Sequence, residues 1–362
     1  MRRSFLRVLT LAALIAVAVI LHALFEVRKT AYSCRTFWTC IGVGRSHAYA
    51  HHIPSAHVGE VIETLRDGTI RYERNVQGAN AEILILTLIR DAASWSSDFR
   101  STQRTAHDFV DVLISSKLDL TNMSLAVMTS SVDEFERLKI ATARVPFCNV
   151  MILLQPDAES SIPYTSRHDP RVQLARRSML AVLRNTLTSR ALKDESHVIW
   201  LDADVTELSD SIVQKMLFHS LTNEKAGIIT AACHQNQMDN YDKNAWSLSP
   251  TQSKGPIQDV DRDAAVRDLV GSKVMIPQLL QGTSDDDLIS LDSVGGTILY
   301  IRANLIRQGL RFPHANAVGT TWGNSGWIGV ETEGICYVAK GLQGGDCYVL
   351  GGRYHVRHTD WG

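Results

Sequence analysis

The sequence lacks an excess of charge of either sign, a Cys-x-x-Cys pair and an internal repeat, and each absence excludes a class of protein. Its 37 Lys and Arg residues nearly balance its 38 Asp and Glu residues, which argues against binding of nucleic acid by bulk electrostatics. None of its six cysteines lies in a Cys-x-x-Cys pair, so we expect no structural zinc site. No unit of about 20–50 residues repeats, which argues against a solenoid. What remains is a globular composition of 362 residues, enough for one large or two ordinary domains.

Long hydrophobic runs are also scarce, and the longest lies at the N-terminus, where residues 8–25 are apolar except for Thr10 and His22. Arginines precede this run, and as a helix it would span about 27 Å, enough for a thin bilayer. A cleaved signal peptide is the alternative, but the run exceeds the usual apolar core of about 7–15 residues and no small-x-small site closes it. We therefore expect a retained signal anchor at 8–25, with residues 1–7 in the cytosol and the rest of the chain in the lumen.

A luminal chain can form disulfides, and two pairs of cysteines are close in the sequence. Cys34 lies near Cys40 and Cys336 lies near Cys347, although the sequence does not determine how the cysteines pair. The triplet at 122–124 (Asn-Met-Ser) fits the acceptor pattern for N-glycosylation, which also occurs by chance. The sequence therefore leaves disulfide connectivity and glycosylation open.

The remainder of the chain divides into a polar lead-in and one folded domain. Residues 26–80 are polar and mixed, which predicts a luminal stem and a lead-in segment. From residue 81 onward, short apolar runs alternate with amphipathic segments, a pattern typical of a parallel sheet covered by helices. We expect one α/β domain over residues 81–362. The expected strands are 81–89, 125–129, 149–154, 198–201, 227–232 and 298–301, and the expected helices are near 109–113 and at 132–143, 171–192 and 209–219.

Two carboxylates, Asp202 and Asp204, follow the apolar run at 198–201. Ligands bind outside the carboxyl ends of strands in open α/β sheets, which is where these residues are expected. Carboxylate oxygens are ligands for Mg²⁺ or Mn²⁺, and such an ion in turn holds a diphosphate. A solvated turn after a strand is the alternative, because Asp-x-Asp is common in proteins.

The expected helix at 171–192 leads into this strand and carries several arginines. Arg177 and Arg184 are seven residues apart, two turns along one side of the helix, so both can face one ligand, and Asn185 follows directly. Guanidinium groups at this place suit a diphosphate. The alternative is that the arginines form the solvated face of the helix.

Residues 234–287 form a long polar stretch with little apolar periodicity, and a loop of that length is usually functional or disordered. Tyr241, Asp242, Asn244 and Trp246 combine hydrogen-bonding groups with aromatic rings in this stretch. Such a mixture suits recognition of a sugar, so we expect these four residues to bind the acceptor.

Two further motifs lie in the C-terminal third. Asp292 precedes the pair Gly295 and Gly296, which would let the backbone approach a ligand closely, with a tight turn as the alternative. Glu331 and Glu333 lie at an expected helix start, where their charges could bind a sugar or simply stabilise the first turn.

Six sequence blocks, in this order, resemble the fungal Golgi mannosyltransferase family that contains the mannan polymerase subunits Anp1, Mnn9 and Van1. They lie within the region of about residues 81–357, and such an ordered series is more specific than a lone Asp-x-Asp. Two departures bear on the acceptor and the linkage more than on the donor site: Leu88 replaces a family proline, and 232–234 reads Ala-Cys-His instead of Asn-Cys-Tyr. The blocks are 85–92 (ILTLIRDA), 167–185, 200–205 (WLDADV), 229–246, 292–297 (DSVGGT) and 331–334 (ETEG).

The resemblance implies a GT-A-like domain, the fold of nucleotide-diphospho-sugar transferases, with a mostly parallel central sheet behind an N-terminal transmembrane helix. It implies a retaining α-1,6-type mannosyltransferase that moves mannose from GDP-mannose to a mannose chain on glycoproteins, with Mn²⁺, or Mg²⁺ in its place. It also implies a single-pass type II protein of the Golgi membrane, with its catalytic domain in the lumen and other mannosyltransferase subunits as partners. The sequence itself does not separate GDP from UDP, and it leaves open the exact linkage, the acceptor and whether the chain is active alone.

The resemblance also assigns roles to residues. Of two C-terminal histidines, His355 is preferred to His358 as a metal ligand because its Tyr-His-Val context matches the family. Of the two glutamates, Glu333 is preferred to Glu331 because Gly334 follows it directly. The expected metal ligands are Asp202, Asp204 and His355; the catalytic residues Asp202, Asp204, Asp292 and Glu333; the donor-binding residues Thr87, Arg90, Asp91, Arg177, Arg184, Asn185, Gly295 and Gly296; and the acceptor-binding residues Tyr241, Asp242, Asn244 and Trp246.

Two other functions fit parts of the sequence. A non-catalytic scaffold subunit of a Golgi complex would share the resemblance, although the intact Asp202, Asp204 and Arg184 argue against it. Residues 202–206 also fit the phosphatase pattern Asp-x-Asp-x-Val/Thr, with 285–287 as a later acidic motif. That class normally carries its Asp-x-Asp on an early strand, whereas about 120 residues of expected α/β structure precede it here.

Overall fold

The computed structural model describes residues 58–97, 102–155, 170–235, 240–248, 271–315 and 329–359. All of them belong to one compact unit that begins at Ile53. Within these ranges, no helix is long and apolar enough to cross a membrane. The anchor predicted at 8–25 and the first part of the predicted stem lie outside the described residues, so they stay predictions.

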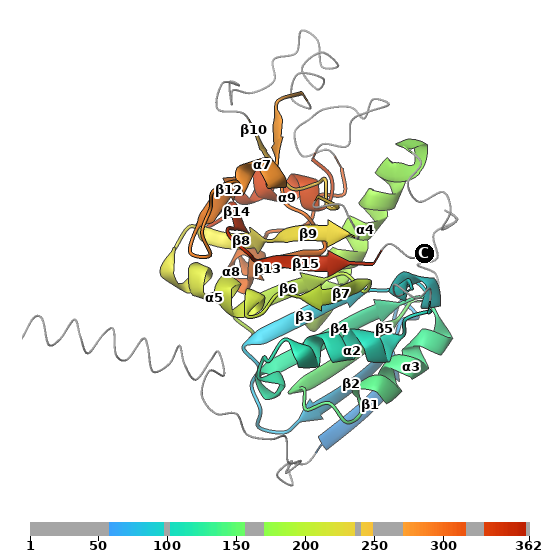
Figure 1. Ribbon diagram of the computed structural model, residues 1–362. Helices are drawn as coiled ribbons and strands as arrows, with labels where there is room; N and C mark the ends of the chain where they lie inside the picture. Colours follow the sequence, from blue (N-terminus) through green and yellow to red (C-terminus); the bar gives the residue numbers. More distant parts are fainter. Residues whose placement is uncertain are drawn as a thin grey trace, which may run out of the picture. The chain divides into compact units, whose positions relative to one another are not determined.

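A ten-stranded sheet forms the centre of the fold (Figure 1). Four of its nine strand pairings are parallel and five are antiparallel, so the sheet is mixed rather than mostly parallel as predicted. Apolar runs reveal buried strands but not their direction, which explains the difference. In spatial order the strands are β1 (Val58–Thr64), β2 (Ile70–Val76), β5 (Asn149–Leu154), β4 (Met123–Thr129), β3 (Ile83–Leu88), β6 (His197–Leu201), β13 (Ile298–Arg302), β8 (Ala226–Thr230), β14 (Asp346–Leu350) and β12 (Leu288–Leu291).

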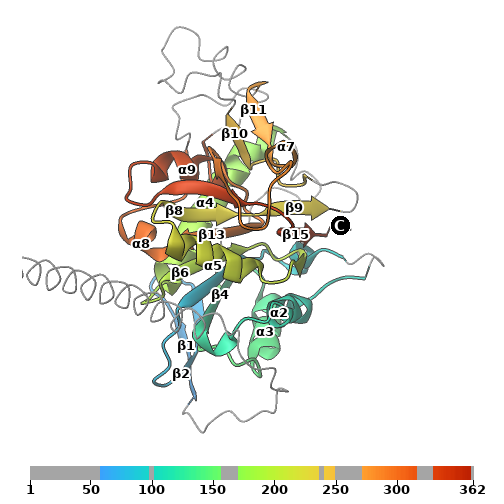
Figure 2. The same cartoon turned by 60° about the vertical axis from the view of Figure 1, so that its left-hand side comes forward.

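Helical crossovers explain three of the four parallel pairings, those among β5, β4, β3 and β6. The crossover helices are α2 (Ala106–Ser115), α3 (Val132–Thr142) and α4 (Pro170–Ala191). α4 packs on one face of these strands, where Ala181 and Leu187 share a core cluster with Leu84 and Leu86. α2 and α3 lie side by side over the other face (Figures 1 and 2).

β13 enters the sheet from the opposite direction and determines where the segment before it lies. It pairs antiparallel with β6, with Ile298 opposite Leu201. Thr297 therefore lies beside Asp202, whose backbone N–H donates to the Thr297 carbonyl oxygen at 3.0 Å. Two segments that are far apart in the sequence thus meet at the carboxyl end of β6.

Two small sheets and several short helices complete the described fold. They are β7 (Val205–Leu208), β15 (His355–His358) and β9 (Ala232–Gln235) in one sheet, β10 (Trp246–Leu248) and β11 (Lys273–Met275) in the other, and the helices η1 (Ala92–Trp95), η2 (Leu120–Asn122), α5 (Ile212–Thr222), α7 (Ile276–Leu279), α8 (Ala303–Arg307) and α9 (Thr332–Ala339). β15 lies between β7 and β9, antiparallel to β7 and parallel to β9. Because β7 begins directly after Asp204, this sheet brings the C-terminal strand next to the Asp-x-Asp segment.

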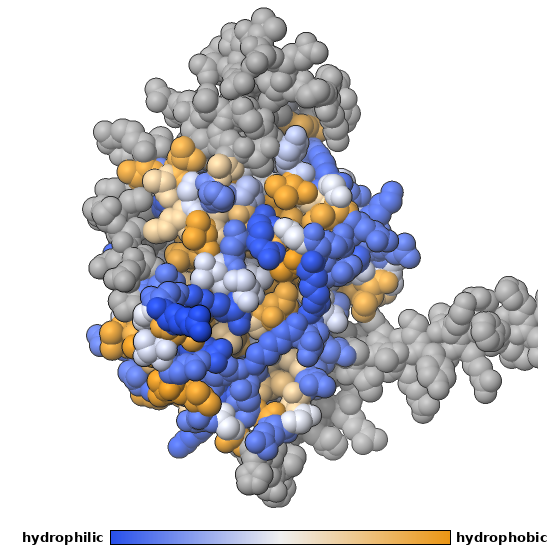
Figure 3. All heavy atoms as spheres, turned by 180° about the vertical axis from the view of Figure 1, so that it is seen from behind, coloured by the Kyte–Doolittle hydropathy of each residue, from blue (hydrophilic) through white to orange (hydrophobic). Residues whose placement is uncertain are grey.

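Large apolar side chains on the described surface are spread over several elements, among them β1, α3, α5 and α9. Seen from behind, polar and apolar side chains are interspersed (Figure 3). Scattered apolar residues of this kind are ordinary on the surface of a protein and need no partner to explain them.

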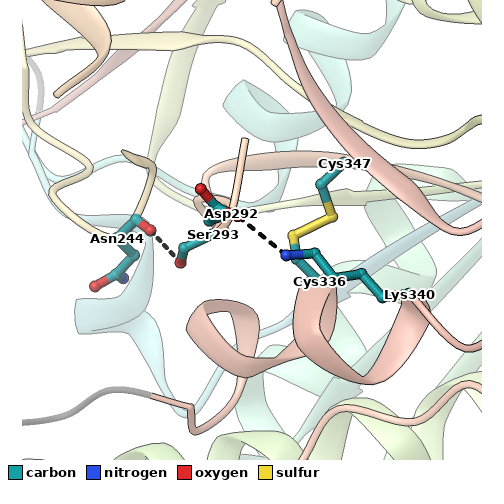
Figure 4. The surroundings of a disulfide bond; sticks show 6 residues. All are labelled: Asn244, Asp292, Ser293, Cys336, Lys340 and Cys347. Atoms are coloured by element: carbon teal, nitrogen blue, oxygen red, sulfur yellow. Dashed lines mark hydrogen bonds and ion pairs between the residues drawn. A yellow bond between two sulfur atoms is a disulfide. The ribbon is translucent and has the colours of Figure 1, made fainter. Parts of the chain in front are cut away.

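One of the two cysteine pairs that are close in the sequence forms a disulfide. Cys336 of α9 is bonded to Cys347 of β14, and the bond ties this helix to the sheet (Figure 4). Cys148 and Cys233 are free and buried. The pair of Cys34 and Cys40 lies outside the described residues.

Removal of this disulfide should destabilise the protein. The two cysteines are 11 positions apart, and closure of a loop of that length contributes roughly 2–3 kcal/mol in the chain-entropy account. We expect the double variant Cys336→Ser/Cys347→Ser to lose about that much free energy of unfolding, measured by urea denaturation. Wild type with a reductant is the control and should unfold at the same urea concentration. A double variant as stable as oxidised wild type would contradict the prediction.

Candidate functional site

A cavity of about 600 Å³ opens at the carboxyl ends of β3, β4 and β6. Asp91 follows β3, Thr129 ends β4 and Asp202 follows β6, and all three line the cavity. Arg177 and Arg184 line it from α4. Its size and its place at the carboxyl edge are those of a ligand site in an open α/β sheet.

The structure brings most of the residues singled out in the sequence to this cavity and leaves the others outside it. Those that line the cavity are Arg90, Asp91, Arg177, Arg184, Asp202, Asp204, Tyr241, Asp242, Asn244 and Gly296. Those that do not line it are Thr87, Asn185, Trp246, Asp292, Gly295, Glu333 and His355. For each residue of the second group, its position in the structure explains why it does not line the cavity.

Asp202 lies between a cation and a second carboxylate. Its Oδ1 is 3.3 Å from Arg184 Nη2. Desolvation raises the pKa of Asp202, and the neighbouring Asp204 carboxylate raises it further. The positive charge of Arg184 lowers this pKa but does not offset the rise, and the resulting pKa is about 7. A divalent cation would relieve this repulsion, since it favours the ionised form of both carboxylates.

The raised pKa predicts how Asp202 affects the stability of the metal-free protein. Its folded-state pKa of about 7 exceeds the ordinary 3.8, so the stability that it contributes is full below about pH 4 and is lost as the pH rises through 7. Asp202→Asn should therefore raise the melting temperature in EDTA at pH 8, and raise it less at pH 5. Because 39% of the side chain is accessible, water in the cavity moderates the effect, and we expect a shift of only a few degrees. Calorimetry at the two pH values measures it, and a variant no more stable than wild type at pH 8 would contradict the prediction.

Arg184 is the buried cation of the cavity wall, only 6% exposed. Its Nε lies 2.7 Å from Glu331 Oε1, in addition to its contact with Asp202. Its guanidinium lies 4.7 Å from the ring centroid of Trp200 and 5.5 Å from that of Phe312. Two rings and two carboxylates thus hold the plane of the guanidinium in one orientation.

Asn185 does not face the cavity, in contrast to the predicted contact with the donor. Its Nδ2 donates to the Phe312 carbonyl oxygen at 2.8 Å, and its Oδ1 accepts from the Phe312 N–H at 2.9 Å. Adjacent residues of a helix point in different directions, so Arg184 and Asn185 cannot face one ligand. Asn185 instead fixes the backbone of the residue whose ring contacts Arg184.

Asp242 fastens the turn that contains the paired glycines. Its Oδ2 accepts from the Gly296 N–H at 2.7 Å and from the Thr297 hydroxyl at 3.2 Å. A Cβ on Gly295 would lie 2.1 Å from this oxygen, and a Cβ on Gly296 would lie 3.0 Å from Arg184 Nη2. The glycines are therefore needed for the close approach of Asp242 and Arg184, and only Gly296 of the pair lines the cavity.

β15 places His358, and not His355, beside the aspartates. His358 Nε2 is 2.9 Å from Asp204 Oδ2, and its ring stacks on that of Tyr241 with 4.1 Å between centroids. Burial lowers the pKa of His358, but the Asp204 carboxylate more than offsets this, and the net shift is upward. His355 instead stacks on His234. Side chains three positions apart in a strand point to opposite faces, which is why only one of the two histidines can reach Asp204.

Glu333 lies behind the cavity wall in a buried network. Its Oε2 is 3.1 Å from Arg177 Nη1, and its Oε1 accepts from Lys273 Nζ at 2.9 Å and from Trp246 Nε1 at 3.2 Å. Burial raises the pKa of Glu333 despite these cations. Arg177 also donates to Asn244 Oδ1 at 2.7 Å. Glu333, predicted to be catalytic, and Trp246, predicted to bind the acceptor, therefore lie behind the wall, where Glu333 holds Arg177 in place and Arg177 in turn holds Asn244.

Glu331 lines the cavity, whereas the sequence favoured Glu333 for this position. It is the residue before α9 and has a φ of +58°, in the left-handed region that is strained for any residue other than glycine. Its Oε2 accepts from the Thr332 hydroxyl at 2.8 Å, while its Oε1 faces Arg184. A strained, buried carboxylate in a cavity suggests function. The two glutamates are two positions apart, and the sequence does not reveal which of them the turn directs inward.

Asp292 and Thr87 also lie outside the cavity. Asp292 Oδ1 is 3.0 Å from Lys340 Nζ (Figure 4), and its Oδ2 accepts from the Leu248 N–H at 2.8 Å. Asp292 therefore ties β10 to the end of α9, near the disulfide. Thr87 is completely buried within β3, and the cavity begins at the next residue, Leu88, because successive strand side chains point to opposite faces.

The second acidic motif of the phosphatase hypothesis is not brought to the cavity. Asp286 pairs with Lys215 of α5, and Asp285 and Asp287 accept backbone N–H groups of neighbouring turns. None of these three carboxylates lines the cavity that contains Asp202. The arrangement of the described residues therefore argues against a phosphatase.

Comparison with known proteins gives a family match over most of the chain. The model of the Anp1 family matches residues 66–316. The mannan polymerase complex subunit mnn9 of Schizosaccharomyces pombe is 33% identical over 206 residues, which are 54% of this chain and 57% of that protein. The subunit MNN9 of Candida albicans is 29% identical over 215 residues, 55% of this chain and 54% of that protein. The chain thus spans about half the length of the curated relatives it matches.

Likeness to solved structures is weak. A mannosyltransferase from Pyrobaculum calidifontis, solved in complex with GDP-Man and Mn²⁺, covers 78% of this chain, and 57% of its own length is matched. Its sequence identity is 8% and its TM-score 0.39, and a likeness of that size carries no argument about this chain.

Proposed function

Because the chain belongs to the Anp1 family, we propose that it is a glycosyltransferase with a GT-A-like domain, which transfers mannose from GDP-mannose with retention. One observation carries this proposal: Asp202, Asp204 and the buried guanidinium of Arg184 share a cavity at the carboxyl edge of the sheet. The carboxylates suit a divalent cation and the guanidinium suits a phosphate oxygen, which together are what a nucleoside diphosphate sugar requires. Relatives named as mannan polymerase subunits support mannose as the sugar.

The nucleoside is proposed to bind at the carboxyl end of β3, next to Arg90 and Asp91. Asp91 is held in place, because its Oδ1 accepts from the Ala93 N–H at 3.0 Å and its Oδ2 from Arg90 Nε at 2.9 Å. A carboxylate is a pure acceptor, and guanine presents two adjacent N–H donors on one edge where uracil presents one. This favours GDP over UDP as the nucleotide.

The donor atoms of the cavity fit Mn²⁺, with Mg²⁺ as the alternative. Across the described ranges, no three acidic, His or Cys side chains are gathered closely enough to hold a metal ion unaided. Asp202 and Asp204 nevertheless offer carboxylate oxygens and His358 an imidazole beside one cavity, and diphosphate oxygens and water would complete the set. When bound, the ion offsets the negative charge that develops on the leaving diphosphate.

Retention requires either a covalent intermediate or a front-face path. Glu331 is the buried carboxylate of the cavity, but it is engaged with Arg184 and Thr332, which argues against it as a nucleophile. We therefore favour the front-face path. The bond from the mannose anomeric carbon to phosphate breaks, the bond to the acceptor oxygen forms on the same face, and the acceptor proton passes to the leaving phosphate. Arg184 stabilises the charge on that phosphate, and positioning supplies most of the remaining rate.

The proposed acceptor is a mannose chain on a glycoprotein, extended in α-1,6 linkage. Tyr241, Asp242 and Asn244 line the cavity and supply an aromatic ring and hydrogen-bonding groups for it. The proposed setting is the Golgi lumen, with the chain anchored as a type II membrane protein beside other mannosyltransferase subunits. The relatives' names as complex subunits support such partners.

A non-catalytic subunit is the second candidate, since the relatives are named as subunits of a complex and not as enzymes acting alone. In that case the cavity would bind no donor. Nucleotide binding therefore separates the two functions.

Titration of the full chain with GDP and with UDP, each with Mn²⁺, tests the proposal. We expect GDP to bind more tightly than UDP, and EDTA to abolish most of the affinity, because a bound cation would offset the repulsion between the diphosphate and the two aspartates. Transfer from GDP-mannose to α-mannobiose is then measured with the same protein. Tighter binding of UDP would contradict the proposed donor, and a folded protein that binds neither nucleotide would support the scaffold role.

A further inference from the structure

Arg104 is a buried arginine that does not line the cavity and yet contacts the Asp-x-Asp segment. It is 5% exposed and lies two positions before α2. Its Nη2 donates to the Val205 carbonyl oxygen at 2.8 Å, and its Nη1 donates to the Ala203 carbonyl oxygen at 3.4 Å. It therefore binds the residues on both sides of Asp204.

With this arginine, every carbonyl of residues 203–205 accepts a hydrogen bond. The middle one, that of Asp204, accepts from the Thr359 N–H at 3.0 Å, and Arg104 supplies the other two. Residues 202–204 lie between β6 and β7, where no strand ladder pairs their carbonyls, so contacts of this kind satisfy them instead. Arg104 supplies these contacts on both sides of Asp204.

The same arginine is tied to the other end of the cavity. Its Nη1 also donates to the Trp95 carbonyl oxygen at 3.3 Å, and its backbone N–H donates to the Ser96 carbonyl oxygen at 2.9 Å. Trp95 ends η1, the turn that begins directly after Asp91. Arg104 thus connects the segment after β3, where the nucleoside is proposed, to the segment after β6, where the metal is proposed.

The side-chain type matters for this connection. A guanidinium presents several N–H donors in a rigid fork, and this fork reaches two carbonyls that are two residues apart. A lysine ammonium would keep the charge but is a single point donor on a flexible stem. Burial of a charge is costly unless it is hydrogen-bonded, so a merely space-filling role would not call for this residue.

We propose that Arg104 is a positioning residue for the metal site. This role rests on the proposed function, because it presupposes that the cavity binds a metal ion. It holds the backbone on both sides of Asp204 so that the carboxylates of Asp202 and Asp204 keep the directions that a divalent cation requires. Outer residues that orient metal ligands typically change metal affinity by about 10–100-fold when they are replaced. Arg104→Lys should therefore weaken Mn²⁺ binding in the presence of GDP by about tenfold or more.

Arg74 provides a matched control. It is 7% exposed and, like Arg104, donates through Nη1 and Nη2 to two carbonyls two residues apart, those of Ala143 and Val145, at 2.9 Å each. None of these residues lines the cavity. Arg74→Lys should cost a similar amount of stability without any effect on the metal site.

The experiment compares the full-length wild type with Arg104→Lys and Arg74→Lys. Calorimetric titration gives the Mn²⁺ affinity in saturating GDP, thermal melts give stability, and hydrogen exchange of the ligand-free proteins follows residues 202–206. We expect only Arg104→Lys to lose metal affinity and to exchange faster in this segment, while both variants melt earlier. Should Arg104→Lys not fold, Gln103→Ala replaces it, because the exposed Gln103 donates to the Arg104 carbonyl oxygen, and its effects should be smaller and in the same direction.

The outcomes separate this proposal from the proposed function. Equal Mn²⁺ affinities of the two arginine variants would overturn the role of Arg104 while leaving the transferase proposal intact. A wild type that binds no Mn²⁺ with GDP would overturn the proposed function and the metal-positioning role together. In that case faster exchange at 202–206 in Arg104→Lys alone would still establish that Arg104 holds this segment.

Discussion

Asp204→Asn should reduce mannosyl transfer by at least about 10³-fold and leave the fold intact. The substitution removes one of two carboxylates from the proposed cation site, and charge stabilisation of a leaving diphosphate by a metal ion amounts to several kcal/mol. The fold should persist because an asparagine Oδ1 can still accept the hydrogen bond from His358 Nε2, which is 2.9 Å away. Initial rates with GDP-mannose, Mn²⁺ and α-mannobiose measure the loss, and circular dichroism checks the fold.

Asp210→Asn is the matched control for this prediction. Asp210 lies six positions further along the chain, its side chain is 79% exposed, and it contacts only Lys117 among the described ion pairs, at 3.4 Å. The substitution makes the same change of charge outside the cavity, so activity should stay near that of wild type. If Asp204→Asn retained more than a tenth of the wild-type rate at saturating Mn²⁺, the aspartate would not belong to the catalytic site.

Arg184→Met should both destabilise the protein and abolish donor binding. The Glu331 side chain is 7% exposed and lies 2.7 Å from the guanidinium, so the variant leaves a buried carboxylate without its cation. Loss of one partner of a buried ion pair costs about 3–5 kcal/mol, and we expect a decrease of that size in the free energy of unfolding at pH 8. Methionine keeps apolar contact with Trp200 and Phe312, so the loss reports mainly on charge. Urea denaturation and titration with GDP measure the two effects.

Glu331→Gln, combined with Arg184→Met in a double-mutant cycle, separates the loss of stability due to the unpaired carboxylate from the loss due to altered packing. Added to Arg184→Met, it removes the unpaired carboxylate and should restore at least half of the lost stability, whereas GDP binding should stay absent. If the double variant were no more stable than Arg184→Met, the loss would come from altered packing against Trp200 and Phe312. The ion pair would then be unimportant for stability.

Local patterns of the sequence predict much of this architecture. The apolar run at 198–201 forms β6, and Asp202 follows it at the carboxyl edge, because a buried strand ends where a charge would otherwise have to be desolvated. The helix expected at 171–192 is α4, and it carries Arg177 and Arg184 on the side of the cavity. Each of these features depends on residues that are neighbours in the chain.

Strand direction is the first feature that local patterns left undecided. β13 and β3 are similar apolar runs, yet β3 pairs parallel with β6 and β13 pairs antiparallel with it. Burial on both faces selects apolar residues in either direction. The connections between the strands decide the direction, and they depend on how the whole chain packs.

The choice between similar side chains is the second feature that local patterns left undecided. His358 and His355, and likewise Glu331 and Glu333, are near neighbours of the same type, and in each pair the sequence favoured the residue that does not line the cavity. In a strand, a shift of one or three positions reverses the face to which a side chain points, and in a turn the backbone dihedral angles decide it. That face is determined by the partner strands and by the strained turn before α9.

The sequence by itself therefore determined six of the strands, the main crossover helices, the family and the Asp-x-Asp edge, since all of these are patterns of adjacent or evenly spaced residues. Only the tertiary structure decided which charged and polar groups meet, because Arg177 and Glu333 are 156 positions apart, and Arg104 and the Val205 carbonyl are 101 apart. Such contacts form only when the strands adopt one register and the helices pack on it. Because an unpaired buried charge is costly, each of these buried groups is then held by the partners that the packing brings within reach.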